Sequence, residues 1–242
     1  MYAVFKRELF SLLNSLMAYI TIGIFLLVSG LLLWVFPDTS ILEYGYAELT
    51  GFFSLAPFLF MFLIPAITMR SFAEERREGT YILLASRPLS DLQIIMAKYL
   101  ACLALVFIAL LPTLLYYYSI VQLGLPRGNI DGGAVTGSYL GLFLLGSAFV
   151  SIGIFSSSVT KNQVIAFAVA VFISFIVYSG FDALSKIFTL NLFESVFAWL
   201  SVNQHFQSMS RGVLDTRDLV YFMTFDLLFL GMTSLVIGGR KW

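Results

Sequence analysis

The sequence holds few residues that could carry out catalysis. A zinc peptidase of the His-Glu-x-x-His type is excluded, because His205 is the one histidine in the chain. The Gly-x-Ser-x-Gly turn of serine hydrolases is also absent. Paired-carboxylate chemistry would need Asp226, inside an apolar segment, and Asp182, at the end of another, in one buried site. We therefore predict no catalytic residue and no metal ligand.

The sequence also lacks the residues that bind and hydrolyse nucleotides. A P-loop requires Gly-Lys followed by Ser or Thr, because backbone amides and that lysine hold the phosphates. The chain contains no Gly-Lys pair. Lysine and arginine together number 14, as do aspartate and glutamate, so no basic surface for nucleic acid is expected. The sequence thus predicts a protein that is not an enzyme and that binds neither a cofactor nor nucleic acid.

A dense run of charge separates two long apolar segments. The run consists of Glu74, Glu75, Arg76, Arg77 and Glu78. A solvated loop is the simplest interpretation of such a run. We expect more order, because a short helix is predicted from Phe72, interrupted at Gly79, and an apolar patch follows at residues 81–84. Mixed charges beside an apolar patch are typical of a surface that docks on a partner.

Asp226 is the other unusual polar residue. It stands inside an apolar segment, where an ionisable group is costly and marks a functional site by default. Two interpretations remain open at this point. The acid either lines or gates a pathway across the membrane, or it is a hydrogen-bonded structural acid facing another helix.

Composition predicts that these residues are positioned by membrane-spanning helices. The chain is 60% hydrophobic and 12% charged, with a mean hydropathy of +0.92. A helix needs about 20 apolar residues to cross the hydrocarbon core. Six segments qualify, at about 16–36, 50–69, 95–121, 135–158, 163–181 and 219–238. We expect an all-α integral membrane protein that forms a single domain over residues 1–242.

Three further elements are expected around the spans. Residues 2–15 have one apolar and one polar helical face, which predicts an amphipathic helix at the membrane interface. Residues 187–202 are apolar but too short to cross, which predicts a re-entrant or interfacial helix before the sixth span. Ser90 and Gln93 have capping-box spacing, which predicts a sharp start to the third span.

The basic residues predict the orientation of the spans. Ten fall on the side of both termini, namely Lys6, Arg7, Arg70, Arg76, Arg77, Arg87, Lys98, Lys161, Arg240 and Lys241. Four fall on the other side, namely Arg127, Lys186, Arg211 and Arg217. The positive-inside rule therefore predicts that both termini and the charged run are cytoplasmic.

Residues 72–100, FAEERREGTYILLASRPLSDLQIIMAKYL, resemble the segment between the second and third spans of type-2 ABC transporter permeases. The resemblance implies that segment 70–90 holds a coupling helix seated on a separate ATPase subunit. It implies ATPase-docking roles for Phe72, Glu74, Glu75, Arg76, Arg77, Glu78, Gly79, Thr80, Leu83 and Leu84. It also implies two ATPase subunits, which bind the ATP, and a second permease half, identical or different.

Residues 205–222, HFQSMSRGVLDTRDLVYF, are similar to a narrower group, the gliding-motility permeases of the GldF type. That resemblance implies a bacterial inner-membrane protein, a GldA-like ATPase and a GldG-like subunit. Two alternatives stay open. One is a membrane scaffold that docks a cytoplasmic partner without transport. The other is an ion-coupled secondary transporter in which Asp226 would be the coupling acid.

Overall fold

The computed structural model describes residues 1–36, 39–41, 48–80, 90–187, 196–197, 199–213 and 215–239. These residues form helices and no strand. Six helical segments are long and apolar enough to cross a membrane, at Leu16–Trp34, Thr50–Glu78, Asp91–Leu123, Gly132–Val159, Gln163–Ser185 and Thr216–Gly238. The predicted all-α membrane fold with six spans is therefore confirmed.

Several spans are built from more than one helix. The second joins α4 (Thr50–Thr68) to α5 (Arg70–Glu78). The third joins α7 (Asp91–Leu110) through a 3-10 turn at Pro112 to α8 (Leu114–Leu123). The fifth joins α10 (Gln163–Phe175) through a π-helical turn to α11 (Phe181–Ile187). The first, fourth and sixth are the single helices α2 (Leu16–Trp34), α9 (Gly132–Val159) and α14 (Thr216–Gly238).

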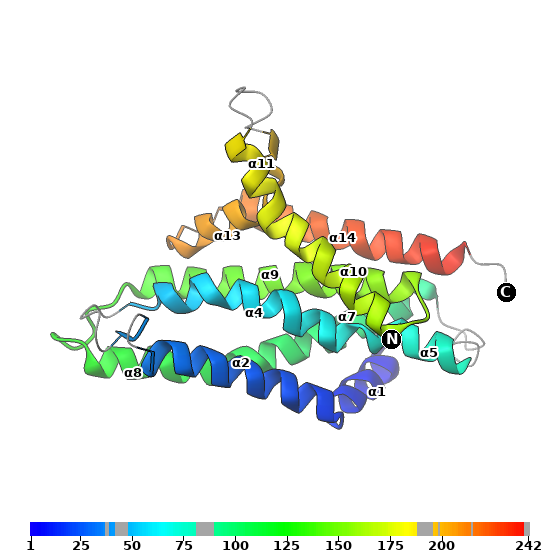
Figure 1. The fold of residues 1–242 in the computed structure, drawn as a ribbon, viewed down its shortest axis with the longest axis horizontal. Helices are drawn as coiled ribbons and strands as arrows, with labels where there is room; N and C mark the ends of the chain where they lie inside the picture. The colour runs from blue at the N-terminus through cyan, green and yellow to red at the C-terminus, as the bar shows by residue number, and fades with distance from the viewer. Residues whose placement is uncertain are drawn as a thin grey trace.

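Helix α9 runs through the middle of the bundle and packs against α4, α7, α10 and α14 (Figure 1). Its small residues permit these close contacts. A methyl group on Gly146 would lie 2.9 Å from a side-chain carbon of Val106 in α7, and one on Gly153 would lie 2.8 Å from Cβ of Thr68 in α4. Both glycines therefore set how closely the neighbouring spans approach α9.

The bundle has two distinct ends. Helix α1 (Tyr2–Leu13), α5 and the last turn of α14 lie at one end, here called the α5 end (Figure 1). The turn between α8 and α9 and helix α13 (Val202–Ser210) lie at the opposite end, called the α13 end. Helix α1 is separate from α2, because Ser15 caps α2 by accepting from the Met17 N–H at 3.3 Å.

The structure tests little of the helix predicted before the last span. Most of the predicted segment at 187–202 lies outside the described residues. The helix that the structure describes, α13, begins at Val202 and packs on α9. A methyl group on Gly137 would lie 3.1 Å from Cα of Gly212, and one on Gly141 would lie 3.2 Å from Cβ of Met209. These two glycines of α9 therefore form the seat of α13 and its C-terminal turn.

Candidate functional site

The charged run is helical and extends the second span beyond the apolar core. Helix α5 begins at Arg70, directly after α4, and ends at Glu78. Gly79 follows with φ of 73°, a left-handed conformation that favours glycine and ends helices. The prediction of a short helix interrupted at Gly79 is therefore confirmed.

Ser157 of α9 caps the start of α5. The N–H groups of Phe72 and Ala73 donate to its hydroxyl oxygen at 2.9 and 3.1 Å. The same hydroxyl donates to the Met69 carbonyl at 3.0 Å. The first N–H groups of a helix have no partner within that helix, so a side chain from elsewhere must satisfy them. One α9 residue thus fixes the direction in which α5 leaves α4.

The family resemblance implies docking roles for Phe72 and Arg76, but the structure buries both. Phe72 is 0% exposed and Arg76 is 6% exposed. The Arg76 guanidinium donates to the Ser158 carbonyl of α9. Because α5 continues directly from α4, the face that packs on α9 extends through α5 as well. These two residues anchor α5 to the bundle and present no surface to a partner in this conformation.

The other predicted docking residues lie further from α9. Glu74 and Glu75 are partly buried, whereas Arg77, Glu78, Gly79 and Thr80 are exposed. Leu83 and Leu84 lie outside the described residues. Among the described docking residues, the exposed ones therefore begin at Arg77.

An ion-pair cluster, defined as Arg7, Glu8, Glu75 and Lys98, joins α5 to α1 and α7. Lys98 Nζ lies 2.8 Å from Glu75 Oε1 and 3.3 Å from Glu8 Oε2. Arg7 pairs with Glu8 and lies 3.4 Å from Glu75 Oε1. The Lys98 side chain is only 2% exposed, so its buried ammonium group needs these carboxylates as partners. A displacement of α5 would therefore change its ion pairs with α1 and α7.

The polar face of α1 is turned toward these charges. Arg7, Glu8 and Ser11 line a cavity of about 580 Å³ that α1 shares with α5 and α7. The cavity also carries Lys98 and Glu74. The amphipathic pattern of residues 2–15 thus serves contacts within the protein, and its place at a membrane interface stays a prediction.

We expect Ser157→Ala to loosen α5 without changing the shape of α9. Two buried N–H groups would lose their acceptor, which should cost about 1–2 kcal/mol of unfolding free energy. Thermal unfolding in mild detergent measures the effect as a lower Tm. Ser156→Ala is the matched control, because the Ser156 hydroxyl donates only within α9, to Ile152 at 2.9 Å. Equal Tm values for the two variants would contradict the capping role.

Asp226 joins three spans. Its Oδ2 accepts from the Tyr99 hydroxyl of α7 at 2.9 Å and from the Ser147 hydroxyl of α9 at 2.8 Å. The residue is 9% exposed, and the cavities found among the described residues do not include it in their lining. Of the two interpretations left open by the sequence, this geometry favours a structural acid that holds α14 against α7 and α9.

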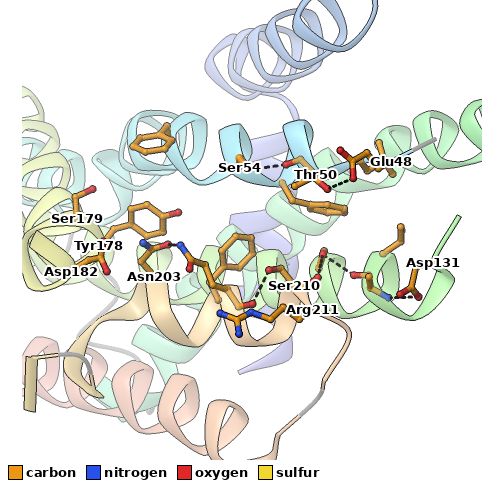
Figure 2. Close-up of a pocket in the computed structure, with 18 of the residues that line it drawn as sticks. Glu48, Thr50, Ser54, Asp131, Tyr178, Ser179, Asp182, Asn203, Ser210 and Arg211 are labelled. Atoms are coloured by element: carbon orange, nitrogen blue, oxygen red, sulfur yellow. Dashed lines mark hydrogen bonds between the residues drawn. The ribbon is translucent and has the colours of Figure 1, made fainter. Parts of the chain in front are cut away.

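A larger cavity, of about 720 Å³, opens at the α13 end between α4, α9, α11 and α13 (Figure 2). Glu48, Asp131, Asp182 and Arg211 supply its charged groups. Two of the acids have local roles, because Asp131 Oδ1 accepts from the Gly133 and Ala134 N–H groups and Glu48 accepts from Thr50. Figure 2 shows polar side chains from separate helices around one space, which suits binding of a small polar ligand.

Sequence reasoning missed this cavity and the ion-pair cluster. The cavity residues are scattered from Glu48 to Arg211, and no motif connects them. Lys98 and Glu8 stand in different predicted elements, so their pairing depends on the fold. The one sequence signal for the cluster was the polar face of α1, and that signal does not indicate which residues the face would contact.

Comparison with known proteins adds a family match. A family model described as "ABC-2 family transporter protein" matches residues 37–238, which include α4 to α14. Among curated proteins, the search returned no match to this chain.

Proposed function

The chain belongs to the ABC-2 family of transporter proteins, and from this premise we propose that α5 is the element through which a separate ATPase drives its movement. Family membership makes the chain a membrane component of a transporter and implies an ATPase partner and a dimeric arrangement. The proposed function is that of the permease subunit, which couples ATP hydrolysis by the partner to movement of a substrate.

The observation that carries this proposal is that α5 continues from α4 and is attached to both α9 and α7. Ser157 and Ser158 of α9 hold its buried face, and Lys98 of α7 holds Glu75. Its last turn, at Arg77 and Glu78, is exposed at the end of the bundle. Force applied to that turn would therefore reach α4, α7 and α9 together, as a coupling helix requires.

Orientation and partners complete the proposal. We place the α5 end, and with it both termini, in the cytoplasm of a bacterial inner membrane, where an ATPase would meet α5. The resemblance of residues 205–222 to gliding-motility permeases supports a role in gliding, with GldA-like and GldG-like partners. The cavity at the α13 end is where we propose that substrate contacts the chain.

The scaffold and secondary-transporter alternatives fit less well. A scaffold would need no connection from the docking turn into the membrane, yet α5 is part of the second span and contacts the third and fourth. A coupling acid would need access to an ion pathway, yet Asp226 is held by Tyr99 and Ser147. The permease role accounts for both arrangements.

We expect Glu78→Lys to weaken docking of the ATPase while leaving the bundle intact. Glu78 is exposed, so its reversal changes the charge pattern of the docking turn without opening the core. Purification of the tagged protein in mild detergent, with intact-mass analysis, should show about tenfold less copurified ATPase.

Arg127→Glu is the matched control, because Arg127 is equally exposed but lies in the turn between α8 and α9, at the α13 end. This variant should retain the ATPase. The proposal fails if no chain with a P-loop copurifies with the wild type, or if the two charge reversals reduce copurification equally.

A further inference from the structure

A second, largely apolar groove runs along α14 toward the α13 end. This α14 groove has a volume of about 580 Å³ and lies between α14, Phe181 of α11 and the residues Trp199 and Leu200. The contributing α14 residues are Thr216, Arg217, Val220, Tyr221, Thr224, Phe225 and Leu228. Residues three or four apart share a helix face, so these side chains form one continuous stripe.

The groove has the depth of one membrane leaflet. Arg217 and Leu228 are 11 residues apart (228 − 217) along one helix. At about 1.5 Å per residue this distance is about 16 Å. The hydrocarbon core of a bilayer is about 30 Å thick, so one leaflet is about 15 Å deep. An acyl chain that enters at Arg217 would end near Leu228.

The mouth of the groove is basic. Arg217 is exposed at the start of α14, and among the described residues no carboxylate accepts a hydrogen bond from its guanidinium. Asp218 is buried and turned to His205, with 2.7 Å between Oδ1 and Nδ1. Asp215 accepts from the backbone N–H of Arg217 at 2.9 Å, which offsets part of the positive charge.

The rest of the groove suits the head-group and acyl regions of a lipid. Trp199, 66% exposed, and Tyr221 stand edge to face with their ring centres 6.3 Å apart. Such aromatic residues concentrate at the membrane–water interface. Val220, next to Tyr221, and Leu228, further along α14, are apolar and 62% and 55% exposed. Polarity therefore falls along the groove in the same direction as it does along a phospholipid.

We propose that the α14 groove binds an anionic phospholipid, with its phosphate on the guanidinium of Arg217 and one acyl chain along α14 as far as Leu228. A guanidinium can hold two phosphate oxygens at once, which favours Arg217 as the head-group contact.

The test compares two lipids with identical acyl chains, phosphatidylglycerol and phosphatidylcholine, added to the delipidated full-length protein. Native mass spectrometry counts the lipids retained. One basic residue near the head group contributes about 1 kcal/mol, so wild type should prefer phosphatidylglycerol about fivefold. Arg217→Gln should abolish that preference, and Arg127→Gln, which changes an exposed cation of the same end, should keep it.

A groove-filling variant separates a site from general lipid contact. Val220→Trp should reduce retention of both lipids while the Tm stays near that of wild type, because Val220 faces outward. The proposal is overturned by equal retention of the two lipids by wild type. It is also overturned if Arg217→Gln keeps the preference, if Arg127→Gln loses it, or if a protein chain occupies the groove in place of lipid.

Discussion

Lys98→Met is expected to lower the stability of the protein more than any change to an exposed charge. The variant leaves Glu75 and Glu8 facing each other without the ammonium group that separates them. Removing one partner of a buried pair costs about 3–5 kcal/mol, and we expect about 2–3 kcal/mol here because the carboxylates are 16% exposed. Thermal unfolding in detergent should show a Tm lower by roughly 5–10 °C.

A double-mutant cycle identifies the cause. Glu75→Gln in the Lys98→Met background removes the uncompensated carboxylate and should recover at least half of the lost stability. Arg7→Gln is the matched control at the rim of the same cluster. The Arg7 side chain is 51% exposed, so its loss should cost under about 0.5 kcal/mol. Additive effects of Lys98→Met and Glu75→Gln would show that the two residues do not act as a pair.

The cluster is compatible with the proposed role of α5 in coupling. Helix α5 alone has nine residues and one buried apolar ring, at Phe72, so it cannot hold its position by apolar contacts alone. Lys98 Nζ lies 5.1 Å from the centre of that ring, in addition to its pairing with Glu75. Polar contacts therefore set the position of α5, and such contacts can exchange partners with little change in packing.

Local features of the sequence predicted most of the architecture. The six spans follow from the length of apolar segments. Gly79 ends α5, as predicted, and the structure adds that it does so in a left-handed conformation. Ser90 and Gln93 form the predicted capping box, which places the start of α7 at Asp91. Each of these predictions depends on residues a few positions apart, where sequence and geometry are directly linked.

The site could be predicted only in part, because its contacts join distant residues. The charged run was found, but Phe72 and Arg76 are buried, since their face of α5 meets Ser157 and Ser158 of α9. Hydropathy cannot indicate which side of a charged helix will meet such partners. The same limit applies to Asp226, because the sequence could not indicate that Tyr99 and Ser147 would be its partners.

Asp226→Leu and Asp226→Asn should separate a structural role of Asp226 from a role in a pathway across the membrane. Leucine removes the carboxylate that accepts from the Tyr99 and Ser147 hydroxyls. We expect a loss of about 2–3 kcal/mol of unfolding free energy. Asparagine keeps a side-chain oxygen in the same place, so it should cost under about 1 kcal/mol. Thermal unfolding of both variants in detergent gives the comparison.

Tyr99→Phe provides the reciprocal change, because it removes the donor and keeps the ring. In the Asp226→Leu background it should cost little further stability, since the two side chains act through one contact. Transport assays in membranes that contain the ATPase then test function directly. A structural acid predicts that Asp226→Asn retains ATP-dependent transport. The opposite result has two parts: transport by the wild type does not depend on ATP, and Asp226→Asn loses transport at an unchanged Tm. That result would identify Asp226 as the coupling acid of a secondary transporter and overturn the permease role.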